Sequence, residues 1–277
     1  MNDSDLELEL IEVRLLLEAV YQRYGYDFRE YALSTMKRRI LKCLAEEKLI
    51  TITALQERIL RDPAVMERLL MDFSIPTSTM FRDPGFFRVF REKVIPILRT
   101  YPYLRIWHVG CSCGEEVYSL AILLKEEGLY QRSRIYATDF NDASLEKAKR
   151  GIFPLSRMKT YTQNYQEAGG GGTFSDYYTT KYEGARFQPG LAKNIVFAQH
   201  NLATDASFNE FHVIFCRNVM IYFNRELQNR VHELLYESLV HLGVLGLGEK
   251  ENLLFTPHEK DYEPLDPRER LFRRKVT

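Results

Sequence analysis

The residues with the clearest chemical potential lie in a turn where Gly110 and Gly114 enclose three small residues. An apolar segment at 104–109 precedes the turn, and a helical pattern at 115–127 follows it. Glycines at such a strand-to-helix junction permit a tight turn and a close ligand, and the helix N-terminus offers unpaired amides to an anion. Because the pattern lacks the spacing of the dinucleotide motif G-x-G-x-x-G, two interpretations remain open: a nucleoside-bearing cofactor or a purely structural turn.

Acidic residues on both sides of this junction add to the first interpretation. Asp139 closes a second predicted strand at 134–138, where a carboxylate can accept both hydroxyls of a ribose. The absence of a third glycine favours adenosylmethionine over NAD. Glu115 and Glu116 open the helix after the turn. They either complement the helix dipole, or one of them binds the ammonium group of the cofactor's methionine part.

A further polar group follows the apolar segment at 213–216. Arg217, Asn218 and Tyr222 come directly after it, and ligands of open α/β sheets bind at the carboxyl ends of strands. These residues are therefore candidates for the same site. In the alternative interpretation Arg217 pairs with a surface acid and Tyr222 is a half-buried core ring.

Arg82 lies between two regions of different sequence pattern. A linker arginine is commonly solvated or salt-bridged, but the junction of two domains is a natural cleft. Arg82 is therefore also a candidate site residue.

The elements that must position these residues fall into two groups. Residues 1–72 show apolar spacing typical of helices, which predicts a small helical bundle. After Arg105 short apolar strands alternate with helices, among them a long helix at 225–242, which predicts a doubly wound α/β sheet. A stretch rich in Tyr, Thr and Gly at 151–193 is too long for an ordinary connection and predicts a small inserted hairpin subdomain or a disordered segment.

The composition excludes several classes of protein. With 45% hydrophobic and 27% charged residues the chain is an ordinary folded protein, and its 38 basic and 38 acidic residues favour neither nucleic acid nor an anionic membrane. No export signal and no membrane span of about 18 to 20 apolar residues is found. The four cysteines are expected to be reduced thiols, and Cys111-x-Cys113 is too tight for a zinc knuckle. We expect a cytoplasmic protein without a metal.

Several long motifs, taken together and in order, closely resemble the chemoreceptor glutamate methyltransferases, the CheR family of bacterial chemotaxis. The resemblance covers almost the full length. The motifs are S-T-M-F-R-D-P at 78–84, G-C-S-C-G-E-E-V-Y-S-L-A at 110–121, Y-A-T-D at 136–139, H-N-L at 200–202 and F-C-R-N-V-M-I-Y-F at 215–223.

The resemblance implies a specific architecture. A helical N-terminal domain is expected at 1–73, and a linker with a connecting helix at 74–100. A Rossmann-like, adenosylmethionine-dependent methyltransferase domain of the α/β class is expected at 101–277, carrying a small inserted β-subdomain at about 152–193.

The resemblance also implies site residues. The expected catalytic residues are Arg82 and Tyr222. A basic helix that approaches the acidic, methylatable helices of a receptor has its counterpart in Lys37, Arg38, Arg39 and Lys42, although such a charge run is also typical of a solvated helix face. The expected cofactor-binding residues, with Gly110 of the turn, are Ser78, Arg82, Glu115, Asp139, Asn201, Leu202, Cys216 and Arg217.

The chain departs from the family pattern in three places. Pro76 stands where many members have an asparagine that contacts the cofactor. The segment Gly246-Leu247-Gly248-Glu249-Lys250 replaces the frequent G-H-S-E. The inserted segment does not match the pattern with which members dock a receptor's C-terminal pentapeptide.

The predicted function is methylation of glutamate side chains on a signalling protein, a bacterial chemoreceptor, with adenosylhomocysteine as the other product. A monomer is expected, which binds acidic receptor helices and neither nucleic acid nor the membrane interior. One alternative is a non-catalytic module that binds adenosylmethionine and signals through its helical domain. Another is a methyltransferase for small carboxylates, which predicts a closed apolar pocket rather than an open basic cleft.

Overall fold

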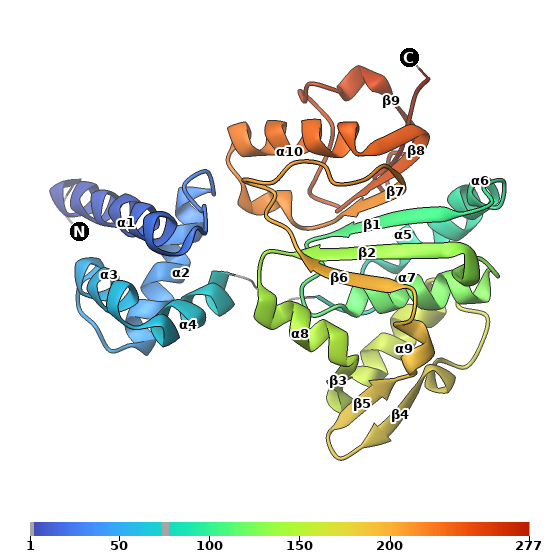
Figure 1. Ribbon diagram of the computed structural model, residues 1–277, viewed down its shortest axis with the longest axis horizontal. Helices are drawn as coiled ribbons and strands as arrows, with labels where there is room; N and C mark the ends of the chain where they lie inside the picture. Colours follow the sequence, from blue (N-terminus) through green and yellow to red (C-terminus); the bar gives the residue numbers. More distant parts are fainter. Residues whose placement is uncertain (1–2, 74–77, 277) are drawn as a thin grey trace. The chain divides into compact units, whose positions relative to one another are not determined.

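The computed structural model describes residues 3–73 and 78–276 and contains two compact units. The first, here called the helical unit, holds the N-terminal helices together with Leu202–Thr204 and Tyr222–Val231. The second, here called the sheet unit, holds the remainder of the chain, including every expected cofactor-binding residue except Leu202. Figure 1 shows the elements of both units.

The N-terminal part of the helical unit consists of four helices, as the apolar spacing predicts. Thr51 caps the third helix, because its side chain accepts a hydrogen bond from the amide of Ala54 at 3.2 Å. The helices are α1 (Asp3–Tyr24), α2 (Leu33–Glu46), α3 (Ile52–Arg61) and α4 (Pro63–Phe73).

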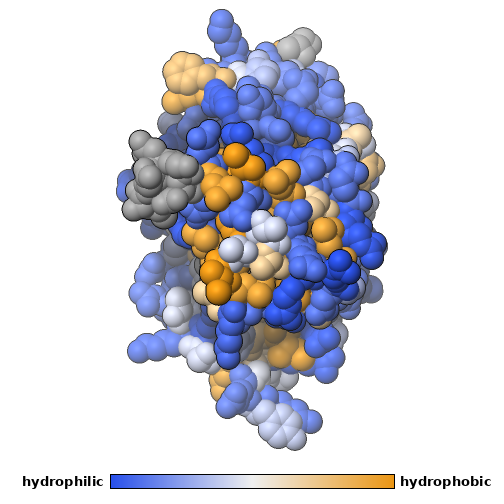
Figure 2. Space-filling view, turned by 90° about the vertical axis from the view of Figure 1, so that its left-hand side faces the viewer, coloured by the Kyte–Doolittle hydropathy of each residue, from blue (hydrophilic) through white to orange (hydrophobic). Residues whose placement is uncertain are grey.

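Helix α1 is apolar on two faces. Val13 and Leu16 are fully buried and belong to the core of the unit. Leu8, Ile11 and Leu15, at helical spacing on the other face, are 59%, 48% and 55% exposed. Figure 2 looks at the left-hand side of Figure 1, where α1 is labelled, and shows apolar side chains gathered on the surface. The core therefore uses only one of the two apolar faces of α1.

The sheet unit contains a seven-stranded sheet of order β6-β2-β1-β7-β8-β10-β9. Strands β6, β2, β1, β7 and β8 run parallel to their neighbours, whereas β10 is antiparallel to both β8 and β9. This confirms the predicted Rossmann-like α/β sheet and adds an antiparallel end. The strands are β1 (Leu104–Val109), β2 (Ser133–Asp139), β6 (Ile195–Gln199), β7 (Phe211–Cys216), β8 (Leu239–Leu247), β9 (Tyr262–Asp266) and β10 (Leu271–Arg274).

Helices and a second, smaller sheet complete the chain. The three strands of the inserted segment form an antiparallel sheet of order β3-β5-β4, as expected of a small β-subdomain, and Figure 1 shows them together with α9 at one end of the sheet unit. No helix within the described residues is long and apolar enough to cross a membrane. The bounds are α5 (Pro84–Val89), a π-helical turn (Phe90–Val94), α6 (Ile95–Leu98), α7 (Glu115–Glu126), α8 (Asp142–Arg150), β3 (Ile152–Pro154), α9 (Met158–Glu167), β4 (Tyr178–Lys181), β5 (Gly184–Phe187) and α10 (Arg225–Glu237).

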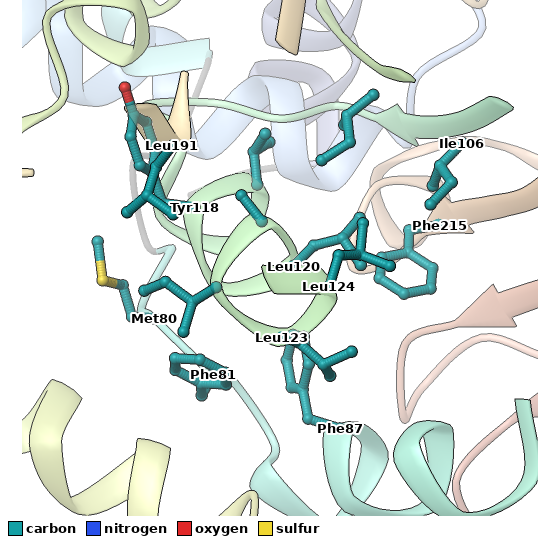
Figure 3. Packing of buried hydrophobic residues seen from close by; sticks show 14 of the residues in the cluster. Met80, Phe81, Phe87, Ile106, Tyr118, Leu120, Leu123, Leu124, Leu191 and Phe215 are labelled. Atoms are coloured by element: carbon teal, nitrogen blue, oxygen red, sulfur yellow. The ribbon is translucent and has the colours of Figure 1, made fainter. Parts of the chain in front are cut away.

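Helix α7 forms the centre of the sheet unit's core. Every residue from Glu115 to Leu124 is buried, so the helix is surrounded on all sides. Burying a large apolar side chain contributes about 1.5–3 kcal/mol, and this core fixes where the first turn of α7 lies. Figure 3 shows side chains of α7 with their neighbours: Tyr118, Leu120, Leu123 and Leu124 with Met80, Phe81, Phe87, Ile106, Leu191 and Phe215.

One predicted element is wrong in its extent. The apolar spacing at 225–242 predicts one long helix, but α10 ends at Glu237 and the chain continues as β8 from Leu239. Strand β8 pairs with β7 at Leu239, opposite Phe211, and after an irregularity again from Val244 to Leu247. Pairing inside a buried sheet outweighs the local helical pattern.

Candidate functional site

Polar residues follow β1, β2 and β7 at one edge of the sheet. These strands are neighbours, and their register pairs Val109 of β1 with Thr138 of β2 and with Cys216 of β7. The turn at 110–114 and Arg217 therefore start from adjacent strand ends. The structure therefore brings together the residues selected directly after these three strands, at the edge where open α/β sheets bind ligands.

The two glycines of the turn are required by close packing as well as by backbone conformation. Gly110 and Gly114 have φ of +61° and +93°. A Cβ on Gly110 would lie 2.5 Å from Val219 Cγ2, and one on Gly114 would lie 2.9 Å from Ala148 Cβ. The turn therefore packs directly against the loop after β7 and against α8.

Asp139 joins the turns after β1 and β2. Its Oδ2 accepts from the amide of Ser112 at 2.9 Å, and its Oδ1 accepts from the amide of Asn141 at 3.0 Å. Burial raises the pKa of Asp139, and these amides oppose the increase. Because each carboxylate oxygen has two acceptor positions, the side chain can also accept the hydroxyls of a ribose.

Glu115 opens α7 and is buried, and its Oε2 makes no hydrogen bond to any residue that the structure describes. Burial raises the pKa of this carboxyl to about 7, although Arg157, Ser78 and Tyr161 lie close enough to lower it. A buried acceptor without a partner is costly in a native protein. Glu115 is therefore suited to receive a cationic group of a ligand.

Glu116, the next residue, is turned toward other protein groups. Its Oε2 lies 2.7 Å from Arg217 Nη1, and its Oε1 lies 3.2 Å from His108 Nε2. Burial favours the neutral acid, but Arg217 and His108 outweigh it and lower the pKa of Glu116. The two adjacent glutamates thus have different roles: Glu115 has an acceptor available, and Glu116 is a buried structural anion.

Arg217 is the cation of this buried network. Its side chain is 1% exposed and pairs with Asp83 Oδ2 at 2.8 Å as well as with Glu116. The guanidinium also lies 4.0 Å from the centre of the Phe86 ring and donates to the carbonyl of Arg82 at 3.2 Å. Both Nη atoms are used by protein groups, whereas the buried Nε has no hydrogen-bond partner among the described residues.

The segment 78–83, here called the strap, carries Arg82 and is held to the sheet unit through its main chain. Phe81 and Asp83 have φ of +50° and +52°, and such backbone strain persists only where the surroundings enforce it. Arg82 is half-buried, with Nε 4.0 Å from Asp83 Oδ2. Hydrogen bonds of 2.9–3.2 Å join Ser78 O to Arg157 Nη1, Met80 O to Asn164 Nδ2, Phe81 N to Ser119 Oγ and Arg82 O to Arg217 Nη1.

Glu251 is a buried residue that the sequence analysis missed. Its carboxylate accepts four amides, those of Asn218, Val219, Met220 and Gly248, at 2.7–2.8 Å. Gly248 and Glu251 have the same spacing as the first and last residues of G-H-S-E, so a shift of two residues in the comparison would have revealed the acid. Glu251 fixes the loop that follows Arg217.

Tyr222 and Arg39 both belong to the helical unit. The Arg39 guanidinium lies 4.8 Å from the centre of the Tyr222 ring, and the amide of Ala32 donates to the Tyr222 carbonyl at 2.8 Å. Arg39 is 4% exposed and donates to the carbonyls of Asp72 and Phe73. An exposed basic face that includes Arg39 is therefore ruled out, because its guanidinium serves the interior of the unit.

The other three basic residues of α2 reach solvent. Lys37 pairs with Glu9 at 2.8 Å, Lys42 pairs with Asp72, and Arg38 is exposed. Two neighbouring cofactor residues of the prediction, Asn201 and Leu202, fall in different units. Asn201 belongs to the sheet unit, where its amide donates to Asp205 at 2.9 Å, and Leu202 belongs to the helical unit.

Ser78 and Cys216 complete the predicted set. Cys216 is fully buried at the end of β7, and Ser78 begins the strap. Pro76, where the family's asparagine contact is missing, lies outside the described residues. Among the residues that the structure describes, no cluster of His, Cys, Asp or Glu could hold a metal ion.

The fold is that of an adenosylmethionine-dependent methyltransferase, and comparison with known families gives the same class. The family described as "CheR methyltransferase, SAM binding domain" matches residues 77–267, and "CheR methyltransferase, all-alpha domain" matches residues 11–74. The chain belongs to the CheR methyltransferase family, and its cofactor is adenosylmethionine.

Curated relatives extend over nearly the whole chain. One from Pseudomonas putida, named "Putative methyltransferase Cher3", is 50% identical over 95% of this chain and 97% of its own length. A "Chemotaxis protein methyltransferase" of Listeria innocua is 31% identical over 83% of this chain and 86% of its own length. "Chemotaxis protein methyltransferase 1" of Pseudomonas aeruginosa is 28% identical, with 91% of this chain and 92% of that protein covered.

Proposed function

We propose that the protein methylates glutamate side chains of a signalling protein, a bacterial chemoreceptor, to give glutamate methyl esters. The relatives named for chemotaxis support a receptor substrate. The structural observation that carries the proposal is the position of Arg82 on the strap, which four main-chain hydrogen bonds hold. An arginine whose main chain is fixed in this way is suited to orient a carboxylate through its planar fork.

The residues at the strand ends fit adenosylmethionine. Asp139 keeps acceptor positions for ribose hydroxyls, and Glu115 Oε2 is a buried acceptor for an ammonium group. Ser112 Oγ is likewise buried and lacks a hydrogen-bonding partner among the described residues. When bound, the cofactor supplies a methyl group attached to a positively charged sulfur.

The chain then needs to position rather than to activate its substrate. A glutamate side chain, with a pKa of about 4.3, is ionised at neutral pH, so no general base is required. Arg82 holds one carboxylate oxygen and leaves the other free to form the bond to the methyl carbon. The proposed role of Tyr222 is to hold the carboxylate through its hydroxyl or to shield the methyl group. Orientation and exclusion of water supply the rate enhancement.

The exposed charges of α2 are proposed to dock the acidic substrate helix. Arg38 is exposed, whereas Lys37 and Lys42 would exchange their present acidic partners for those of the substrate. Such surface pairs contribute only about 0–1 kcal/mol, so the exchange costs little. Reversing the charge with Arg38→Glu is expected to raise KM for the protein substrate and to leave binding of adenosylhomocysteine unchanged.

The proposal is tested with tritiated adenosylmethionine and the membrane fraction of the host. Wild type and the control Arg88→Ala, which removes an exposed arginine of α5, should label a receptor band with methyl groups that base releases as methanol. Arg82→Ala should label it about a hundredfold more slowly, because the carboxylate is no longer oriented.

Three results would contradict the proposal. If Arg82→Ala or Tyr222→Phe transferred methyl groups at the wild-type rate, the role assigned to that residue would be wrong. Base-stable label would exclude an ester. Cofactor binding without labelling of any acidic protein would favour a non-catalytic signalling module.

A further inference from the structure

Helix α9 of the inserted segment presents a polar face to the strap. Arg157, Tyr161 and Asn164 are spaced four and three residues apart and so lie on one side of the helix. Arg157 donates to the carbonyl of Ser78 at 3.0 Å, and Asn164 donates to the carbonyl of Met80 at 2.9 Å. The inserted segment therefore holds the part of the chain that leads to Arg82.

Tyr161 lies between Arg157 and Asn164 on this face of the helix. Its hydroxyl has no evident structural role. The side chain is 1% exposed, and its oxygen has no ordinary hydrogen bond to any residue that the structure describes. It lies close enough to Glu115 and to Arg157 for each to influence its pKa. Glu115 Oε2 is buried without a partner in the same way.

The Tyr161 hydroxyl lies close enough to Glu115 to donate its one hydrogen toward the carboxylate. The phenol oxygen then still has a lone pair that can accept, and so does Glu115 Oε2. Buried acceptor positions of this kind call for a donor from a ligand. The group that complements acceptor positions on a carboxylate and on a phenol at once is a cation with more than one N–H. A primary ammonium has three such donors and no acceptor. A hydroxyl has only one hydrogen and could satisfy only one of the two acceptors.

We propose that Tyr161 is a further cofactor-binding residue, which together with Glu115 receives the α-ammonium group of adenosylmethionine and of adenosylhomocysteine. The proposal rests on the methyltransferase assignment above and does not depend on the protein substrate. In this proposal the inserted segment contributes to the cofactor site, because α9 contacts both the cofactor and the strap that carries Arg82.

The test is calorimetric titration with two ligands that share the adenosine and the thioether. Adenosylhomocysteine carries the amino-acid end, and methylthioadenosine lacks it. Tyr161→Phe is expected to weaken binding of adenosylhomocysteine about tenfold, as loss of a hydrogen bond to a charged group predicts. Binding of methylthioadenosine should not change.

The matched control is Tyr165→Phe, which removes another tyrosine hydroxyl from α9. That hydroxyl bonds to Glu126 and to the amide of Gly172, away from Glu115, so the affinities for both ligands should remain those of wild type. Glu115→Gln should lose affinity for adenosylhomocysteine alone. In the double variant with Tyr161→Phe the two losses should not add, because both residues bind one group.

Three results of these titrations would have different meanings. An equal loss for both ligands in Tyr161→Phe would mean that the hydroxyl only supports the fold. Unchanged affinity for adenosylhomocysteine would overturn the proposal outright. Failure of the wild-type protein to bind either ligand would instead remove the cofactor site as a whole.

Discussion

Arg217 Nη1 lies 2.7 Å from Glu116 Oε2, and both side chains are almost completely shielded from solvent. The pair connects the loop after β7 to the first turn of α7, and its second branch to Asp83 reaches the strap. A buried ion pair need not stabilise a fold more than apolar residues would. Here Arg217 also holds the carbonyl of Arg82 and the side chain of Asp83.

Breaking this pair should be strongly destabilising. Arg217→Met leaves Glu116 and Asp83 without their cation, and a buried charge without a partner costs about 3–5 kcal/mol. Urea denaturation followed by circular dichroism measures the loss. Arg217→Met combined with Glu116→Gln should recover part of it, because the double variant no longer buries an anion at position 116. A double variant no more stable than Arg217→Met alone would show that the pair is not the reason.

Glu251 should control the order of the loop at 218–220. Glu251→Gln replaces a carboxylate that accepts four amides by a side chain with one acceptor oxygen and one donor nitrogen. We expect a loss of about 2–3 kcal/mol in stability and faster hydrogen exchange at the amides of Val219 and Met220. The exposed Glu249→Gln is the control. Unchanged exchange at these amides in Glu251→Gln would contradict the assigned role.

The side chain of Val219 should be the main obstacle to a larger residue at position 110. In Gly110→Ala the new Cβ would lie 2.5 Å from Val219 Cγ2, at a φ of +61° that alanine disfavours. The variant should lose about 2–3 kcal/mol, from overpacking and backbone strain together. Adding Val219→Ala should restore the packing part and leave the backbone part. Thermal unfolding of the two variants measures the difference, and no recovery in the double variant would mean that the contact with Val219 is not limiting.

The sequence predicts the scaffold of the site well, because its signals are local. The turn at 110–114, the acid at Asp139 and the polar residues after β7 each follow from a strand end, and the sheet then brings them together. What could not be predicted depends on packing between distant segments. Nothing near Glu116 or Arg217 in the sequence indicates that they pair across 101 positions. Likewise, Tyr161 resembles any tyrosine of an amphipathic helix.

The same limit explains the errors. Arg39 belongs to a run of basic residues, which predicts a solvated face, yet its guanidinium is buried against two carbonyls and the ring of Tyr222. The end of α10 was misplaced because the residues after Glu237 suit a helix as well as a strand, and only the pairing with β7 decides between them. Tertiary contacts outweigh local preference in both cases.

Glu115 should make cofactor binding and stability depend on pH in opposite directions. Burial raises its pKa to about 7 without ligand, above the value of 4.5 for an exposed glutamate. The folded chain therefore binds more protons than the unfolded chain between these values, and stability falls as pH rises through this window, by about 3 kcal/mol at most. Binding an ammonium group requires the ionised form, so affinity for adenosylhomocysteine should rise between pH 6 and 8 and then level off.

Glu115→Gln should remove both dependences, as calorimetry and urea denaturation at each pH would show. Because Asp139 and Glu251 also titrate with raised pKa values, the effect of Glu115 is the difference between wild type and this variant. Parallel profiles for the two proteins would show that Glu115 does not carry the charge that the cofactor meets.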